Sequence, residues 1–356
     1  MNQFGERFTF STFGESHGKA LGCIVDGIPA GIEIDETFIQ SELDRRKPGQ
    51  NAYATARKEG DVVEILSGVF EGKSTGTPIA MVIYNTNQKS KDYTNIKDVF
   101  RPGHADFTYW HKYAIRDYRG GGRSSARETA ARVAAGAIAK LMLHELGVTC
   151  KSGVCEIAGI TSETFDFSYP QKSEIYALDA NIEQAQKDAV LKAKEAHDSV
   201  GGVAVVSISG APIGLGEPMY HKLDGALAGA MMGINAVKGV EIGDGIASTK
   251  VHGSDNNDPI RNSGFESNHS GGILGGISNG DEIVIKVHFK PTPSIFKTQH
   301  TTTTQDEEVD FSLKGRHDPC VAIRGSIVAE SMAALVIADM VLLNMGRQIQ
   351  GVKNYY

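Results

Sequence analysis

The chain has 356 residues, a net charge of −7 at pH 7 and 41 glycines. The length allows one or two domains with a substantial core, and the acidic balance argues against a nucleic-acid or membrane-surface binder. Four scattered cysteines without a CxxC pair are typical of reduced thiols in a cytoplasmic protein: Cys23, Cys150, Cys155 and Cys320.

Hydrophobic periodicity and turn residues predict a mixture of strands and helices. In chain order we expect strands within 1–34, a helix at 35–43, strands at 62–69 and 79–84, a loop at 85–100, a helix at 130–146, a helix at 181–197, a strand at 203–209, a helix at 224–237, a strand at 283–289, a polar mobile segment at 297–310 and a helix at 326–345. Asp35 is a suitable N-cap for the first helix. The helix at 130–146 is apolar nearly all round, which indicates a buried position.

No linker divides the chain and no repeat is evident, so these elements predict one α+β domain over residues 1–356, with antiparallel strands covered by helices. The most apolar late run, 327–343, contains Glu330 and Asp339. We therefore do not expect it to span a membrane.

The segment 119–129 is the most informative stretch of the sequence. It contains three consecutive glycines, which permit positive φ and close approach of a ligand. Ser125 and Glu128 match a capping box, in which Ser125 accepts from the Glu128 amide. A glycine loop that leads into a helix start offers free amides and the positive end of the helix dipole, so we expect an anion site here.

Basic residues around this loop strengthen that expectation. Arg119, Arg123 and Arg127 carry planar guanidinium groups that suit phosphate and carboxylate. Residues 101–132 hold six arginines and one lysine against three acidic residues, a local excess of four positive charges in an acidic protein. This pattern indicates a small, highly anionic ligand. The alternative interpretation is a flexible loop whose arginines are only solvated.

Several common sites are not predicted. The sequence has no HExxH, no His-x-His and no Cys/His cluster at zinc spacing, so we expect no metal. The P-loop and the dinucleotide-binding fingerprint are also missing.

Three titratable residues lie beside glycine or proline in expected loops: His17, His104 and Asp318. A histidine near arginines can exchange a proton with a leaving phosphate. Ser16 and Ser125 are plausible hydrogen-bond partners for an anion, so phosphate chemistry is one interpretation of these residues.

A serine hydrolase is the rival interpretation. Residues 14–18 fit the string Gly-x-Ser-x-Gly around Ser16. The strand, sharp elbow and helix that should surround such a nucleophile are not predicted, because the segment leads into a strand.

Eight motifs considered together resemble the chorismate synthase family. They extend over about residues 4–345 and lie at 14–18, 45–49, 101–106, 119–129, 235–239, 275–280, 290–294 and 315–320. The resemblance implies a carbon–oxygen lyase that uses reduced FMN for the anti 1,4-elimination of phosphate from 5-enolpyruvylshikimate 3-phosphate. The product would be chorismate, in the last common step of the shikimate pathway to the aromatic amino acids.

The resemblance also implies residue roles. His17 would be the proton donor to the departing phosphate, His104 would manage protonation of the reduced flavin, and Asp318 would lie near flavin N5. Ser16 and Ser125 would act in supporting relays. FMN contacts would come from Arg123, Ser124, Ser125, Asn235, Ala236, Gly275, Lys290, Pro291, Thr292, Pro293, Ser294 and Arg316, and substrate contacts from Arg46, Arg101 and Arg127.

One position departs from the family pattern. Ala52 stands where many members carry a further arginine. Either Arg57 or a lysine compensates, or the substrate or a pyridine nucleotide is bound with one fewer contact.

Further expectations follow from the resemblance. They are a single-domain β-α-β sandwich with helices packed between antiparallel sheets, and a homotetramer. The scattered cysteines indicate a cytoplasmic location. The sequence leaves open whether the protein reduces its own flavin with NADPH; because no nucleotide-binding fingerprint is visible, we expect NADPH to act indirectly, through an external flavin reductase. A non-catalytic protein that binds flavin or a phosphorylated metabolite is the other alternative.

Overall fold

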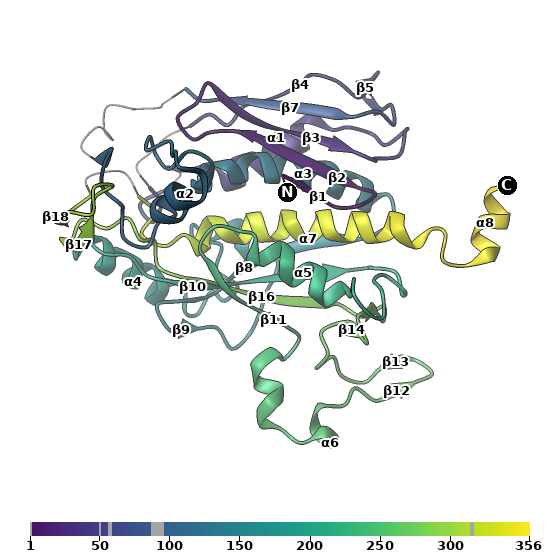
Figure 1. Cartoon of the computed structure of the whole chain (residues 1–356). Helices are drawn as coiled ribbons and strands as arrows, with labels where there is room; N and C mark the ends of the chain where they lie inside the picture. Colours follow the sequence, from purple (N-terminus) through teal and green to yellow (C-terminus); the bar gives the residue numbers. More distant parts are fainter. Residues whose placement is uncertain (1, 50, 56–58, 87–95, 314–316) are drawn as a thin grey trace.

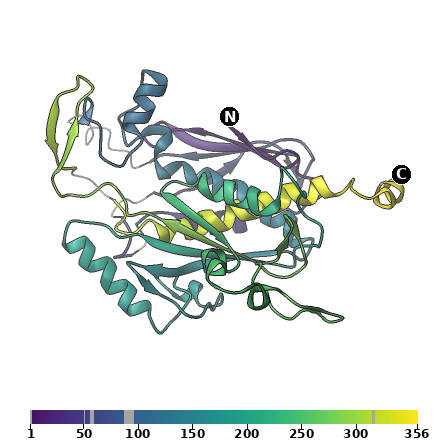
Figure 2. The same ribbon diagram turned by 60° about the horizontal axis from the view of Figure 1, so that its bottom comes forward.

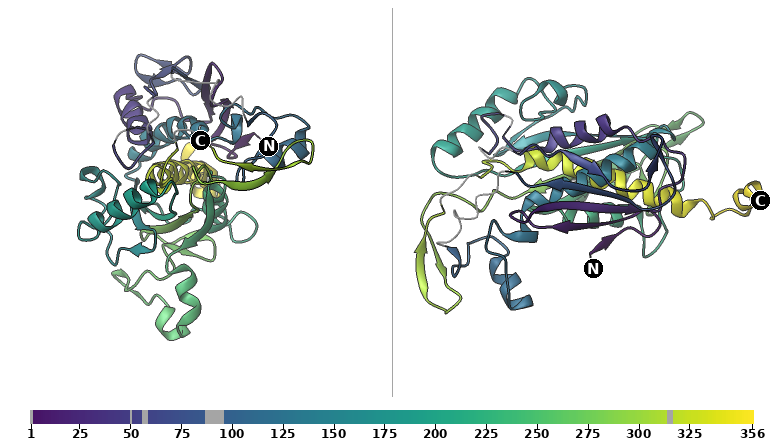
Figure 3. Two further views of the ribbon diagram at one scale, coloured as in Figure 1. Left: turned by 90° about the vertical axis from the view of Figure 1, so that its left-hand side faces the viewer. Right: turned by 90° about the horizontal axis from the view of Figure 1, so that it is seen from above.

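The fold is built around two long helices that lie between two antiparallel sheets (Figure 1). A computed structural model describes residues 2–49, 51–55, 59–86, 96–313 and 317–356. The two helices are α3 (Thr129–His144) and α7 (Ala322–Asn344), and they pack against each other. Viewed along α7, the layers follow one another as sheet, helices and sheet (Figure 3).

The first sheet comes from the N-terminal part of the chain. Its strand order is β1-β2-β3-β7-β4, with every neighbour antiparallel. The strands are β1 (Gln3–Phe4), β2 (Thr9–Gly14), β3 (Ala20–Asp26), β7 (Ile79–Tyr84) and β4 (Val63–Ile65). β7 matches the predicted strand, whereas the predicted strand at 62–69 is divided between β4 and β5 (Val69–Phe70), which pairs with β6 (Lys73–Ser74).

The second sheet comes from the C-terminal half, in the order β11-β16-β10-β8-β9, and it is also antiparallel. Its strands are β11 (Val237–Ile242), β16 (Ile283–Phe289), β10 (Gly202–Ser209), β8 (Thr149–Ile157) and β9 (Ile160–Thr161). Residues of β16 alternate between buried and half-buried, as a strand with one core face should.

Close packing of α3 on α7 depends on a small residue. A Cβ at Gly136 would lie 2.5 Å from the Ser331 Cβ and 2.8 Å from its Cα, so only glycine fits there without a shift of the backbone. By length and composition α7 could cross a membrane, but 83% of its most apolar window is buried inside the protein, as in a core helix. The same window contains Glu330 and Asp339, both buried.

The other helices lie around this core. They are α1 (Glu36–Arg46), α2 (Asp106–Tyr113), α4 (Glu183–Glu195), α5 (Leu223–Met232), α6 (Gly253–Asn256) and α8 (Ile349–Tyr355), with 3₁₀ turns at Gly122–Ser124, Ala126–Glu128, Pro170–Lys172 and Gly245–Lys250. The predicted cap is present: Asp35 accepts from the amides of Thr37 and Phe38 at the start of α1. The predicted helix at 224–237 ends earlier, because Val237 begins β11.

Short hairpins complete the fold: β12 (Ile260–Arg261) with β13 (Gly264–Phe265), β14 (Ile273–Leu274) with β15 (Ile277–Ser278), and β17 (Gln299–Thr302) with β18 (Glu308–Phe311). The last hairpin corrects the prediction of a mobile polar segment at 297–310. Its threonines are β-branched and favour strands, and the Phe100 amide donates to the Thr302 carbonyl at 3.0 Å. Figure 2 shows this hairpin at the same end of the molecule as α2.

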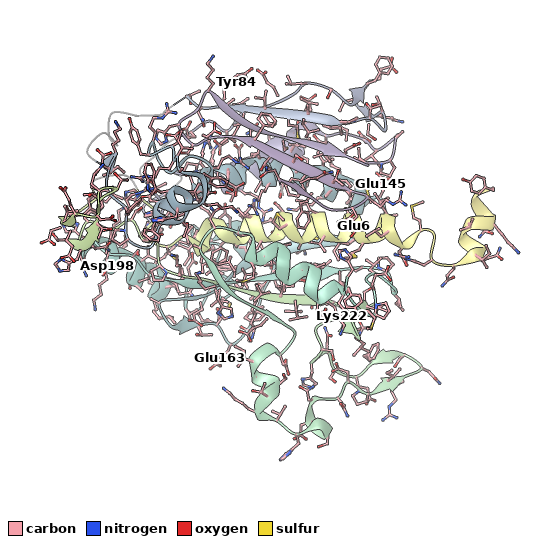
Figure 4. All side chains as sticks on the ribbon, in the orientation of Figure 1. Glu6, Tyr84, Glu145, Glu163, Asp198 and Lys222 are labelled. Carbon is pink, nitrogen blue, oxygen red and sulfur yellow. The ribbon has the colours of Figure 1, made fainter. Side chains whose placement is uncertain are left out.

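The mixed α+β class predicted from the sequence is confirmed. Buried residues of both sheets and of α3 and α7 belong to one continuous core. Side chains fill the space between the sheets, as Figure 4 shows.

Candidate active site

A cavity of about 360 Å³ opens at the N-terminal end of α7. This volume lies in the range of small-molecule sites. Its wall comes from segments far apart in the sequence, and its described residues are His17, Arg46, Pro48, Thr55, Arg101, Gly103, His104, Ala105, Gly120, Gly121, Ser124, Ser125, Ala126, Arg127, Asn235, Ala236, Val237, Lys238, Lys290, Thr292, Pro293, Ser294, His317, Asp318, Val321 and Arg324.

The glycine loop forms one wall. Gly120, Gly121 and Gly122 have φ values of 61°, 83° and 53°, as predicted for a left-handed glycine run. A Cβ at Gly120 would lie 2.2 Å from ring atoms of His17, so the absence of a side chain lets the loop and the histidine lie together.

The predicted capping box between Ser125 and Glu128 is wrong, because neither side chain has the predicted partner. Ser125 Oγ accepts from the Arg127 amide at 3.3 Å and starts a 3₁₀ turn, so α3 begins only at Thr129. The Glu128 carboxylate pairs with Arg132, four residues along the helix, and does not reach back to Ser125. The α-helical start is therefore displaced from the cavity, and the turn 126–128 lies between them.

Two of the cavity arginines share one buried carboxylate. Arg46 Nη1 donates to Asp61 Oδ2 at 3.0 Å, and Arg127 Nη1 donates to the other oxygen of Asp61. Burial alone would raise the pKa of Asp61, but Arg46 and Arg127 outweigh it and hold that pKa below its usual range. Burial, followed by the charge of Arg324, lowers the pKa of Arg46 to about 9, so it stays charged at neutral pH.

Arg101 is held by its own carboxylate. Its Nε and Nη2 donate to the two oxygens of Asp106 at 2.7 and 2.9 Å, a bidentate pair. Burial alone would raise the pKa of Asp106, but hydrogen bonding and charge from Arg101 hold it low. Both carboxylates lie behind the cavity and orient cations toward it, so the wall presents positive charge.

Two histidines beside Arg101 are neutral at physiological pH. His104 Nε2 lies 2.7 Å from Ser294 Oγ. Burial and then Arg101 lower the pKa of His104 to about 3, and the same causes lower the pKa of His317 to about 4. A neutral imidazole can donate one hydrogen bond and accept another, so these residues suit hydrogen bonding to a polar edge of a bound group.

The Ser16–His17 pair packs against the glycine loop at Gly120. Ser16 Oγ is 3.0 Å from His17 Nδ1 and donates to the Gly120 carbonyl at 3.2 Å. Ser16 is buried and does not belong to the cavity wall, whereas His17 does. The segment joins β2 to β3, so the strand–elbow–helix context of a hydrolase nucleophile is missing here, as the sequence predicted.

Asp318 has two partners. Arg324 Nη2 donates to Asp318 Oδ2, and the Thr55 amide donates to Oδ1 at 3.2 Å. Thr55 and Arg324 come from segments 269 positions apart in the numbering, and both line the cavity. The carboxylate is therefore fixed at the point where the loop before α7 meets the loop after α1.

Unsatisfied polar atoms gather in the cavity wall. In the part of the chain that the structure describes, five buried atoms of wall residues have no hydrogen-bond partner: Arg127 Nη2, Asn235 Oδ1, Thr292 Oγ1, His317 Nε2 and Arg324 Nε. Leaving such groups unpaired costs about 1–3 kcal/mol each. This mixture of donors and acceptors fits a ligand with anionic, hydroxyl and heterocyclic groups.

Not every predicted site residue lines the cavity. Arg123 turns to β2, where it donates to the Gly14 carbonyl at 3.0 Å and to Thr12. Pro291 packs beside Gly201, and Arg119 is half exposed and paired with Asp117. The anion-site prediction therefore applies to Arg127 but not to the other two arginines of the loop.

Gly275 lies far from the cavity. It belongs to the turn between β14 and β15, and the neighbouring Gly276 carbonyl accepts from Leu223 at the start of α5. Figure 4 labels the adjacent Lys222 at the end of the molecule away from Asp198 and from the start of α7. Two further predicted residues, Arg316 and Arg57, lie outside the described residues. Ala52 accepts from Lys194 through its carbonyl at 2.9 Å.

Sequence reasoning missed three residues of the site. Asp61 lies outside the recognised motifs, and no local pattern marks it as the partner of two arginines. Arg324 lies in the first turn of α7, two residues before the predicted start of that helix. His317 lies in the motif at 315–320, but the sequence predicted no role for it. Arg324 could have been predicted from the sequence, because it is a cation in the first turn of an otherwise apolar helix.

Known proteins resemble this chain over its whole length. A family model described as "Chorismate synthase" matches residues 8–342. Chorismate synthases of Sulfurimonas denitrificans and Aliarcobacter butzleri are 72% and 69% identical over 356 residues, covering 100% of this chain and 99% of each relative. A solved structure, "Crystal Structure of Chorismate Synthase", is 33% identical with a TM-score of 0.77 and covers 99% of this chain and 96% of its own.

Proposed function

Because the chain belongs to the chorismate synthase family of carbon–oxygen lyases, we propose that the cavity at the start of α7 binds 5-enolpyruvylshikimate 3-phosphate beside reduced FMN. Phosphate would then leave C3 of the substrate while a hydrogen leaves C6, and chorismate is formed. The observation that carries this assignment is the convergence of Arg46, Arg101 and Arg127 with His17 and His104 on one cavity of about 360 Å³.

The three arginines would hold the phosphate and the two carboxylates of the substrate. Among the described residues, Arg46 uses three N–H groups on Asp61, the Ala126 carbonyl and Thr129 Oγ1, out of the five donors of a guanidinium. Within the same part of the chain, Arg101 and Arg127 also have N–H groups without a protein partner. Each cation is fixed by protein contacts before the substrate arrives, which lowers the entropic cost of binding.

His17 would donate a proton to the departing phosphate. Ser16 Oγ lies 3.0 Å from His17 Nδ1 and donates to the Gly120 or Arg119 carbonyl, so the imidazole ring is fixed beside the glycine loop. A histidine held in this way at the cavity wall would transfer its proton to the phosphate oxygen that leaves.

The cofactor side of the cavity would be formed by residues after α5 and β16: Asn235, Ala236, Lys290, Thr292, Pro293 and Ser294, with Ser124 and Ser125 of the glycine loop. The unpaired Asn235 Oδ1 and Thr292 Oγ1 support this assignment. When bound, reduced FMN supplies the electron density that an elimination at an unactivated carbon needs. His104 would hold or move a proton at its edge, with Ser294 fixing the imidazole ring, and Asp318 would face the same group.

The test is an anaerobic assay of the purified protein with 5-enolpyruvylshikimate 3-phosphate, with and without reduced FMN, following chorismate and free phosphate. We expect both products only when reduced FMN is present. Phosphate release without flavin would favour the serine hydrolase, and tight binding without turnover would favour the non-catalytic binding protein.

We also propose that the protein is a single sandwich-type domain that assembles as a homotetramer. Both sheets bury one face on α3 and α7 in one continuous core, which supports the single domain. The outer face of the first sheet exposes Phe13, Ile24 and Tyr84 by 44%, 44% and 54%, which supports a subunit interface. Sedimentation at micromolar concentration checks the subunit number.

For its location and reductant we propose the cytoplasm and an external flavin reductase. The four described cysteines are free, and three of them are buried, which suits a reducing compartment. Because the sequence carries no nucleotide-binding fingerprint, NADPH would act indirectly. Anaerobic NADPH oxidation with FMN and the purified protein measures this: we expect none without added reductase.

A further inference from the structure

A buried network of charges holds the last turn of α1. Both oxygens of Glu330, in the middle of α7, accept from Arg45 in a bidentate pair at 2.8 and 2.9 Å. Lys140 of α3 pairs with Glu330 and with Glu42 of α1, and Ser152 of β8 donates to Glu330 at 2.6 Å. The network therefore joins α1 to both central helices and to the second sheet.

The network is electrically balanced, with two carboxylates and two cations. Burial would raise the pKa of Glu330, but Lys140 and Arg45 lower it to about 2. A buried charge whose partners are all in place is held in one geometry, because any displacement leaves an uncompensated charge.

Tyr176 makes a second contact with the last turn of α1, through the backbone of Arg45. Its hydroxyl donates to the Arg45 carbonyl at 2.7 Å. The backbone of Tyr176 is itself anchored on the second sheet, since its carbonyl accepts from the Val154 amide at 2.7 Å. The Arg45 residue is thus fixed by its side chain through Glu330 and by its carbonyl through Tyr176.

The next residue in the chain is Arg46, the last residue of α1 and part of the cavity wall. We propose that Tyr176 and Glu330 are positioning residues that place Arg46 for the anionic substrate. Neither residue lines the cavity among the described wall residues, so they act through the α1 turn. The inference rests on the proposed function, because Arg46 is taken there as a substrate ligand.

Three contacts and almost complete burial fix the position of the Arg46 guanidinium. Its Nε, Nη1 and Nη2 meet Thr129, Asp61 and Ala126 at 3.2, 3.0 and 3.1 Å, and its side chain is 1% exposed. A displacement of the α1 turn would weaken these bonds and the alignment of the other N–H groups of this guanidinium. Small misplacements of this kind are costly for binding and catalysis.

The experiment compares Tyr176→Phe with Tyr169→Phe. Both variants lose one hydroxyl, and the Tyr169 hydroxyl donates to Glu183 at the start of α4, whereas the Tyr176 hydroxyl donates to α1. The wild-type enzyme is assayed first, and absence of turnover there would refute the proposed function itself. For an active enzyme we expect Tyr176→Phe to raise KM for 5-enolpyruvylshikimate 3-phosphate about two- to tenfold, the worth of one hydrogen bond, with kcat within about twofold of wild type. Tyr169→Phe should leave KM unchanged.

A KM for Tyr176→Phe equal to wild type would overturn the proposal. An equal rise in both variants would do so as well, because loss of stability alone would then explain it. Glu330→Gln provides a second measurement: at a temperature where the variant is folded by circular dichroism, KM should rise more than in Tyr176→Phe. An unchanged KM in folded Glu330→Gln would also contradict the assignment.

Discussion

Asp61 illustrates how single residues behind the cavity determine what faces the ligand. Its side chain is fully buried and bridges Arg46 and Arg127, so one negative charge holds two positive ones in place. Asp117 makes a comparable pair with Arg119, but at the surface, where the arginine is 45% exposed.

These two aspartates give a matched prediction. We expect Asp61→Asn to lower the free energy of unfolding by about 3–5 kcal/mol, because two buried guanidinium groups lose their counter-charge. Asp117→Asn should cost no more than about 1 kcal/mol, as exposed pairs do. Urea denaturation measures both, and equal losses would show that burial of the Asp61 cluster has no energetic consequence.

The histidines of the site should separate chemistry from cofactor binding. We expect His17→Ala and His104→Ala to lower kcat by about 10²–10⁴-fold, the usual contribution of acid–base groups, while FMN still binds in an absorbance titration. His300→Ala, at the exposed β17–β18 hairpin, is the control. If both cavity variants unfold or lose FMN binding, the two histidines are structural.

The lowered histidine pKa values also predict a pH dependence of stability. His104 and His317 titrate near 3 and 4 when folded and near 6.5 when unfolded, so below pH 6.5 the unfolded chain binds more protons. Stability should fall as the pH drops, by about 1–1.5 kcal/mol per histidine between pH 7.5 and 5.5. Between these pH values the stability of His317→Asn should fall by about 1–1.5 kcal/mol less than that of the wild type. Urea melts measure the difference, and an equal fall in both proteins would contradict the low pKa of His317.

At the scale of elements, the contact of α3 with α7 depends on Gly136. A Cβ there would meet the backbone of Ser331 at 2.8 Å, whereas a Cβ at Gly229 of α5 would meet nothing within 4 Å. We expect Gly136→Ala to destabilise by about 1–3 kcal/mol through overpacking. Gly229→Ala should be neutral or stabilise by up to about 1 kcal/mol through helix propensity. Equal melting temperatures for the two variants would argue against the close crossing.

Sequence periodicity predicted the elements whose burial pattern is regular. β7 and β16 match their predicted ranges, and α3 and α7 differ by a few residues at their ends. The β17–β18 hairpin was missed because its polar threonines pair across the strands and with residues near Phe100, a contact that no local pattern contains.

The site was predictable only in part, for the same reason. The glycine run indicated positive φ, and three such residues are found there. The orientation of Arg123 toward β2 and the sharing of Asp61 by two arginines depend on tertiary contacts. The motif resemblance named many of the cavity residues, but it also named Arg123, Pro291 and Gly275, which lie outside the wall, and it did not supply the mutual arrangement of the others.

At the scale of the whole molecule, the cavity exists because the layers bring loop ends together. His17 lies between two strands of the first sheet, whereas Ser294 follows β16 of the second. Arg324 lies in the first turn of α7, the helix between the sheets. A site assembled in this way requires both sheets to be docked on α3 and α7, so we expect folding and ligand binding to be lost together.

The central claim is that one cavity gathers the arginines, the histidines and both ligands. A crystal structure of the protein with oxidised FMN and 5-enolpyruvylshikimate 3-phosphate tests it most directly, because the proposed elimination would need the reduced flavin. We predict density for both molecules at the start of α7, with the substrate anions within hydrogen-bond distance of Arg46, Arg101 and Arg127. Ligands bound elsewhere, with these side chains facing only protein and water, would contradict the account.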